Sequence, residues 1–217
     1  MIKAYFCIDG FSFKRINDFY KYEHRRHSRL NLSAFESYLR YEMKRRMGIS
    51  SDVSNLVFEK HFYHPNQDPR QCPYKSDIGD AILKFESNVV NSNYVMHYAQ
   101  NSSTLNPKPN ENLFMDSVVA AKQNRVDIFI LLSTQGQYAC ILKQMKNCGI
   151  PSVLVCWNSI CKNSYGNSSF WRTDSALRNS ANVCCPLEKI LNLPNGKHPI
   201  VESMFAGVPS LSIQITS

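Results

Sequence analysis

Short apolar runs of strand length alternate along this chain with segments whose apolar residues recur at helical spacing. The alternation predicts βαβ units, in which each helix connects two parallel strands of one sheet. We therefore expect an α/β fold, a three-layer sandwich with a mostly parallel central sheet. The expected strands cover residues 4–9, 55–63, 94–98, 126–133 and 152–157, the expected helices cover 33–47, 77–85, 111–123 and 138–147, and segments 170–179 and 183–191 complete the sheet and its cover.

The chain has 217 residues, of which 43% are hydrophobic, and this composition suits one domain with a complete core. We expect that domain to cover residues 1–190, followed by an unassigned C-terminal tail at 191–217. No apolar stretch approaches the roughly 20 residues of a membrane-spanning helix, and the N-terminus lacks the pattern of a signal peptide. These features predict a cytoplasmic protein without a membrane span.

The eight cysteines contain no Cys-x-x-Cys pair, and several of them lie inside apolar runs. Reduced thiols in a cytoplasmic protein account for this usage. His61, His64 and Cys72 would supply three zinc ligands, but no fourth ligand follows at a standard spacing. We therefore expect no structural zinc.

The net charge of +8 is concentrated near the N-terminus, where residues 14–46 hold ten Lys and Arg against four Asp and Glu. Tyr, Phe and His side chains lie between these cations. Such a mixture suits single-stranded RNA, because phosphates pair with the cations and bases stack on the rings. A solvated helix face is the alternative. The candidate RNA-binding residues are Lys14, Arg15, Arg25, Arg26, Arg29, Lys44, Arg45 and Arg46.

Two places satisfy the rule that open α/β sheets bind ligands outside the carboxyl ends of their strands. Asp9 ends the first expected strand, and residues 133–138 follow the most apolar one. Asp116 interrupts an apolar stretch, so it faces either solvent or the same cleft. Carboxylates gathered in such a cleft hold Mg²⁺ or Mn²⁺ against a phosphodiester. The alternatives are a capping role for Asp9 and a solvated helix position for Asp116.

Three motifs, in chain order, resemble those of the NYN family of PIN-like ribonucleases. Residues 7–13, Cys-Ile-Asp-Gly-Phe-Ser-Phe, are similar to the opening IDGFN signature of that family. Residues 110–116 resemble its VDVxLAxD segment, and residues 126–138 resemble its DVAVLVSGDGDF block. The likeness extends over about residues 3–190. It implies a Rossmann-like, PIN-like fold and a metal-dependent endoribonuclease that acts on RNA phosphodiesters.

The departures from these motifs fall mainly on acidic positions. Asn110 replaces the first Asp of the middle motif, and Gln135 and Gln137 replace two acids of the third. A neutral amide does not help to neutralise a divalent cation, so weakened catalysis is expected. By the resemblance, the candidate catalytic residues are Asp9, Asp116, Gln135, Gln137 and Ser12, which replaces an Asn, and the candidate ligands of Mg²⁺ or Mn²⁺ are Asp9 and Asp116. Glu111, next to Asn110, is a candidate for a displaced third carboxylate ligand, and the alternative is an acid favoured by the dipole at the start of a helix.

Three functions stay open at this point. The first is a weak or context-dependent metal-dependent ribonuclease, and the second is a catalytically inactive RNA-binding module that keeps the nuclease fold. The third is an assembly subunit, which forms a homo-oligomer or binds a protein partner through the C-terminal tail. Metal-dependent cleavage of a generic RNA, abolished by Asp9→Asn, would separate the first function from the other two.

Overall fold

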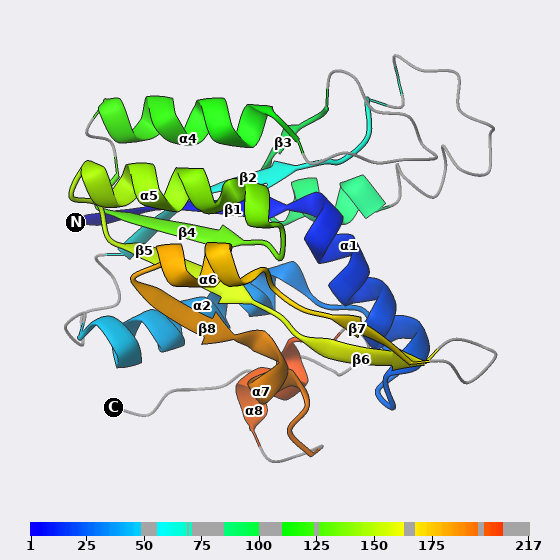
Figure 1. The fold of residues 1–217 in the computed structure, drawn as a ribbon. Coiled ribbons are helices and arrows are strands. Elements are labelled where there is room, and N and C mark those ends of the chain that lie inside the picture. Colours follow the sequence, from blue (N-terminus) through cyan, green and yellow to red (C-terminus); the bar gives the residue numbers. More distant parts are fainter. Residues whose placement is uncertain are drawn as a thin grey trace.

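A six-stranded parallel sheet lies between two layers of helices (Figure 1). All neighbouring strands of this sheet are parallel, which confirms the expected Rossmann-like three-layer sandwich. In spatial order the strands are β3 (Val95–His97), β2 (Leu56–Tyr63), β1 (Ile2–Asp9), β4 (Ile128–Leu132), β5 (Ser152–Cys156) and β8 (Val183–Pro186). The computed structural model describes residues 1–48, 56–68, 70, 85–99, 110–123, 126–162, 168–194 and 198–205.

Alternate side chains of each strand point to opposite sides of the sheet, and a buried cluster covers each side. On β1, Phe6 and Ile8 belong to one core cluster, whereas Tyr5 and Cys7 belong to the other. The helices beside the first cluster are α1 (Gly10–Asp18), α2 (Leu32–Met47), α7 (Leu187–Leu191) and α8 (Pro199–Ser203), and those beside the second are α4 (Asn112–Lys122), α5 (Ala139–Asn147) and α6 (Ser175–Ser180).

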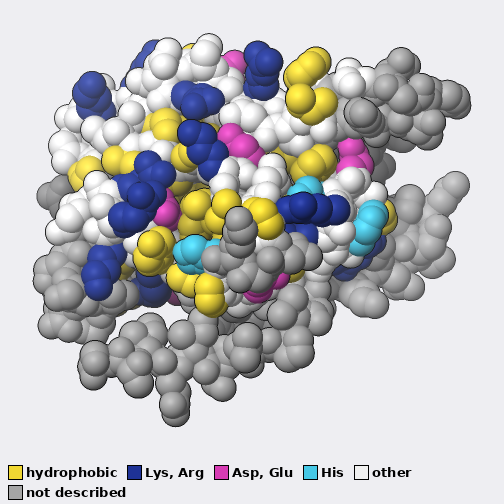
Figure 2. All heavy atoms as spheres, turned by 90° about the horizontal axis from the view of Figure 1, so that it is seen from below, with side chains coloured by type: hydrophobic (Ala, Val, Ile, Leu, Met, Phe, Trp, Pro, Cys, Tyr) yellow, Lys and Arg dark blue, Asp and Glu magenta, His cyan; other side chains and the backbone are white. Residues whose placement is uncertain are grey.

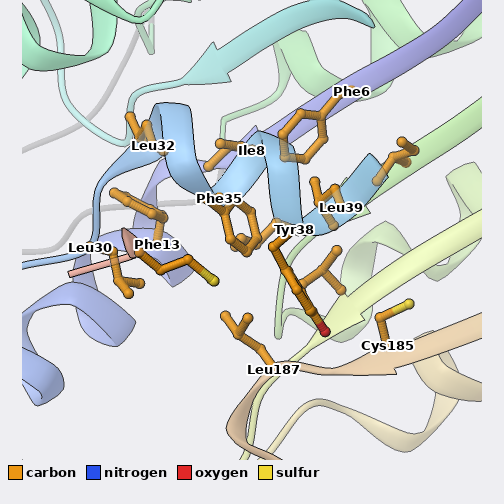
Figure 3. Packing of buried hydrophobic residues seen from close by; sticks show 14 of the residues in the cluster. Phe6, Ile8, Phe13, Leu30, Leu32, Phe35, Tyr38, Leu39, Cys185 and Leu187 are labelled. Carbon is orange, nitrogen blue, oxygen red and sulfur yellow. The ribbon is translucent and has the colours of Figure 1, made fainter. Parts of the chain in front are cut away.

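Helix α2 packs its apolar stripe against β1, as its helical spacing predicts. Figure 3 shows Phe35, Tyr38 and Leu39 of α2 beside Phe6 of the strand. The helix begins one residue before the expected Ser33, because the side-chain oxygen of Asn31 accepts hydrogen bonds from the amides two and three residues further on.

Several structural elements were not predicted from the sequence. Helix α1 continues directly from β1 and is followed by a π-helical turn at Phe19–Glu23. An antiparallel hairpin of β6 (Ser159–Lys162) and β7 (Ser168–Trp171) follows β5. Most of the helix expected at 77–85 lies outside the described residues.

The described part of the C-terminal tail packs against the domain. Val201, Met204 and Phe205 are buried in the same cluster as α2, and Phe205 forms an isolated antiparallel bridge with Leu30. The packed unit therefore extends beyond the expected boundary at residue 190. Among the described residues, no helix is both long and apolar enough to cross a membrane.

Candidate functional site

The strand order reverses between β1 and β4, so the ligand crevice of this architecture lies at the carboxyl ends of these two strands. Asp9, the last residue of β1, is buried there. Its Oδ2 accepts hydrogen bonds from Ser12 Oγ at 2.7 Å and from Ser133 Oγ at 2.8 Å. Its Oδ1 accepts one from the Phe11 amide at 3.1 Å. Asp9 thus caps α1 and ties this helix to the end of β4.

The electrostatics of Asp9 follow from its burial. Desolvation raises the pKa of its carboxyl, and the hydrogen bonds from Ser12, Ser133 and Phe11 oppose the rise. Partial burial lowers the pKa of Arg15, and the negative charge of Asp9 opposes that effect. Asp9 is therefore a buried, hydrogen-bonded carboxyl group with the guanidinium of Arg15 nearby.

A cleft of about 280 Å³ opens outside this buried network. One side comes from α1 and from the turn after β4, and the other comes from the ends of β5 and β7 and the turn into α6. The residues that line it are Ser12, Arg15, Thr134, Gln135, Gly136, Trp157, Phe170, Trp171, Arg172 and Asp174.

Guanidinium groups and aromatic rings meet in this cleft. The Cζ atom of Arg15 lies 3.9 Å from the ring centre of Trp171 and 4.3 Å from that of Phe11. Arg172 lies 5.5 Å from the ring centre of Phe170, whose side chain is 60% exposed. Stacking holds each planar cation on a ring while its N–H groups stay available to an anion.

The cleft also contains one carboxylate, that of Asp174. Its amide donates to the Thr134 carbonyl at 3.1 Å, and its Oδ1 caps α6 by accepting from the Ala176 amide at 2.7 Å. A Cβ atom at Gly136 would lie 2.5 Å from the Asp174 Cγ. A side chain at position 136 would therefore force this carboxylate to shift.

Asp116 lies in a different environment, on α4, where its side chain contacts the ends of β2 and β3. Its Oδ2 is 3.1 Å from His97 Nδ1 and accepts a hydrogen bond from the Tyr63 hydroxyl at 3.2 Å. His97 Nε2 is 2.8 Å from His61 Nδ1, and His61 Nε2 is 3.2 Å from a Glu59 carboxylate oxygen. Burial lowers the pKa of both histidines. Asp116 thus ends a chain of polar side chains and is not among the residues that line the cleft.

Three other positions of the sequence motifs also lie outside the cleft. Asn110 is buried, and its side-chain amide donates to the carbonyls of His64 at 2.9 Å and His97 at 3.0 Å. Glu111 and Gln137 are exposed and line no part of the cleft. The structure therefore brings Asp9, Ser12 and Gln135 together and places Asp116, Glu111 and Gln137 elsewhere.

The candidate metal ligands do not form one donor set. Both oxygens of Asp9 accept hydrogen bonds, Asp116 contacts His97 and Tyr63, and Glu111 is exposed just before α4. Within the part of the chain that the structure describes, no group of three or more His, Cys, Asp or Glu side chains is arranged to hold a metal ion. The geometry of these residues does not fit the implied Mg²⁺ or Mn²⁺ centre.

Most candidate cations of residues 14–46 already contact other groups of the protein, so they do not act as one RNA-binding surface. Arg15 lines the cleft, whereas Arg26 forms an ion pair with Glu202 at 2.9 Å, and its side chain is only 4% exposed. Figure 2, seen from the side of α7 and α8, shows Lys and Arg scattered rather than gathered in one patch. Of the other candidates, Lys14 pairs with Asp18, Arg25 contacts the carbonyls of Asn192 and Leu193, Arg45 and Arg46 pair with Glu42, and Arg29 and Lys44 are exposed.

Half of the cleft was missed by the sequence analysis. Phe170, Trp171, Arg172 and Asp174 come from a hairpin and a turn that no sequence motif indicated. The one available signal was the Phe-Trp-Arg cluster, which places two aromatic residues and a cation side by side between polar residues.

Together, the strand order and the cleft at the reversal point define a Rossmann-like α/β protein with a basic and aromatic ligand cleft. Neither a protein-family model nor a curated protein matches the sequence. In structure, the chain is similar to a protein of unknown function from Vibrio parahaemolyticus, known from a crystal structure, with a TM-score of 0.51 and 11% sequence identity. The alignment covers 86% of this chain and 93% of that protein. At this identity the similarity shows a shared fold and nothing about function.

Proposed function

We propose that this chain is an RNA-binding protein of the PIN-like class, which holds single-stranded RNA in the cleft at the reversal point of its sheet. The observation that carries the proposal is the pairing of two guanidiniums with aromatic rings inside one cleft, at Arg15 with the partly buried Trp171 and at Arg172 with the exposed Phe170. Single-stranded RNA presents phosphates and unstacked bases together, and this combination matches cations beside aromatic faces.

Binding is favoured over cleavage because the buried acid is already committed. Asp9 is buried and already receives three hydrogen bonds from α1 and from the end of β4, so a metal ion would have to enter this network to reach it. Arg15 and Arg172, by contrast, need no rearrangement to meet a phosphate. The cleft therefore supports the RNA-binding module more directly than a metal-dependent nuclease.

Fluorescence anisotropy with a labelled single-stranded RNA of mixed sequence tests the proposal. Each of Arg15→Gln and Arg172→Gln should weaken binding and reduce the log–log salt slope by about 0.7, the value for one lost single-strand phosphate contact. Lys146→Gln, which removes the same charge from the exposed end of α5, is the matched control and should leave the slope unchanged. Equal affinity and slope for all three variants would exclude the cleft as the RNA site.

The ring contribution is tested separately. Phe170→Ala removes an exposed ring without a buried contact, and it should weaken binding by about 1–3 kcal/mol if a base stacks there. Its salt slope should equal that of the parent protein, because no cation is lost. A change in slope instead of affinity would contradict the assignment of a base to this ring.

A metal-dependent ribonuclease is the second candidate function, and one observation favours it. The Asp174 carboxylate lies in the same cleft as Ser12 and Gln135, so the cleft contains one acidic side chain. If this function is right, incubation with Mn²⁺ or Mg²⁺ should cleave a generic RNA, and both Asp174→Asn and Asp9→Asn should abolish cleavage. RNA that is bound but stays intact with either metal would leave the binding module as the function.

A further inference from the structure

Helix α4 presents an apolar stripe on the side that faces away from the sheet. Its buried residues, Leu113, Ser117, Ala120 and Ala121, share one side of the helix. On the opposite side Met115 is 60% exposed and Val119 is 47% exposed. Figure 1 shows α4 as the outermost helix of its layer. Exposed apolar side chains gathered on one helix face are more than the scattered single residues that any surface carries.

Charges mark the two ends of this stripe. Glu111 precedes the first turn of α4, and Lys122 lies in the last turn, and both are exposed. Successive steps of four, three and four residues lead from Glu111 to Met115, Val118 and Lys122. These steps keep the four side chains on one face of a helix, opposite the buried side. The stripe thus runs from an acid through apolar residues to a base.

We propose that this face binds a second copy of the same chain, with the two α4 helices packed antiparallel about a two-fold axis. In that arrangement Glu111 of each copy lies opposite Lys122 of the other, and Met115 lies opposite Val118. Each of the four residues Glu111, Met115, Val118 and Lys122 thus meets a complementary residue, as an isologous contact requires.

The occupant is assigned from charge complementarity. A parallel pair of helices would place Glu111 against Glu111 and Lys122 against Lys122, which is repulsive. An antiparallel pair replaces both repulsions by attractions and also sets the two helix dipoles in opposite directions. No residue of α4 lines the RNA cleft, so the dimer contact and the proposed RNA contact are separate.

The contact is limited to about one helix from each copy, so it is smaller than a standard interface of about 800 Å² per partner. We therefore expect a dimer that dissociates on dilution. Sedimentation velocity of the full chain over a wide range of concentrations should show a shift from dimer to monomer. A monomer at all concentrations up to about millimolar, beyond the range in which such contacts operate, would overturn the proposal.

Charge reversal gives the sharper test, because each single substitution places two like-charge pairs in the dimer. Glu111→Lys or Lys122→Glu should weaken dimerisation by about tenfold or more, and the double reversal should restore the parent value within about threefold. Met115→Lys should abolish the dimer. The control is Lys143→Glu on the exposed side of α5, which makes the same charge change as Lys122→Glu outside the stripe. A double reversal no better than the singles, or a dimer unaffected by Met115→Lys, would refute the antiparallel α4 contact.

Discussion

Arg26 belongs to the basic segment, but its surroundings predict a structural role. Its guanidinium donates to both carboxylate oxygens of Glu202, at 2.9 and 3.0 Å, and to the Leu193 carbonyl at 3.0 Å. It also lies 4.5 Å from the ring centre of Phe205. The Arg26 side chain is 4% exposed and that of Glu202 is 20% exposed. Arg26→Ala therefore removes a cation that donates to both oxygens of a largely buried carboxylate.

The expected loss follows from that burial. Removing one partner of a buried ion pair costs about 3–5 kcal/mol, and the partial exposure of Glu202 places this case near the lower end, at about 3 kcal/mol. For a chain of this size, that loss lowers the Tm by roughly 6–12 °C. Differential scanning calorimetry measures the shift. Arg29→Ala, which removes an exposed cation from the same segment, should change stability by less than about 0.5 kcal/mol.

A double variant separates buried charge from general damage. Replacing both partners by apolar residues, as Arg26→Met with Glu202→Leu, removes both charges of the ion pair and should recover much of the lost stability. RNA affinity measured well below the Tm should be unchanged in Arg26→Ala, because this side chain is not available to phosphates. An Arg26→Ala protein with the parent Tm and weakened RNA binding would refute the structural role.

Three further predictions concern other buried contacts. Burial lowers the pKa of His64 to about 4, below the unfolded value near 6.5, so the free energy of unfolding should fall by about 3 kcal/mol as the pH drops from 6.5 to 4. Urea titrations measure this loss; His64→Gln should remove it, and an unchanged pH dependence in that variant would contradict the prediction. Gly136→Ala should lower the free energy of unfolding by about 1–3 kcal/mol through the clash with Asp174. The double variant with Asp174→Ser should lose less stability than the sum of the two single variants, and strict additivity would mean that no clash exists. A hydrogen bond with the Cys156 thiol and the charge of Arg178 hold the pKa of the Cys184 thiol below its usual range. Alkylation at neutral pH, followed by mass spectrometry, should therefore modify Cys184 faster than the exposed Cys148, and Arg178→Gln should slow the modification of Cys184; equal rates for the two cysteines would contradict the prediction.

The sheet could be predicted because its signals are local. The run at 126–133 is apolar throughout and has the length of a strand, and it became β4 within two residues of the expected start. Helix α1 was missed because its cap, Asp9, is also the last residue of β1, so no loop separates the strand from the helix. A boundary with no intervening turn leaves no sequence signal to recognise.

The candidate site was only partly predictable because it depends on contacts between distant segments. Asp9 and Ser12 were found through the crevice rule and the resemblance, and they do contact each other. Arg172 and Asp174 reach the same cleft from beyond β5, and this approach depends on a hairpin whose exposed Ile160 and Phe170 follow no amphipathic pattern. In the same way, the pairing of Arg26 with Glu202 joins residues 176 positions apart, so charge counting along residues 14–46 could not detect it.

Because residues 198–205 pack on one side of the sheet, the two cores can be completed at different times during synthesis. Among the residues that the structure describes, the core on the α4 side contains none later in the chain than Cys184, so it can close before residues 198–205 are made. The core on the α2 side needs Val201, Met204 and Phe205, and the Phe205 ring packs 5.5 Å from that of Tyr20. Because chains are made from the N-terminus, Tyr20 and Leu30 lack their contacts with Phe205 until that residue has left the ribosome. That interval exposes an apolar surface to chaperones on one side of a sheet whose other side is already folded.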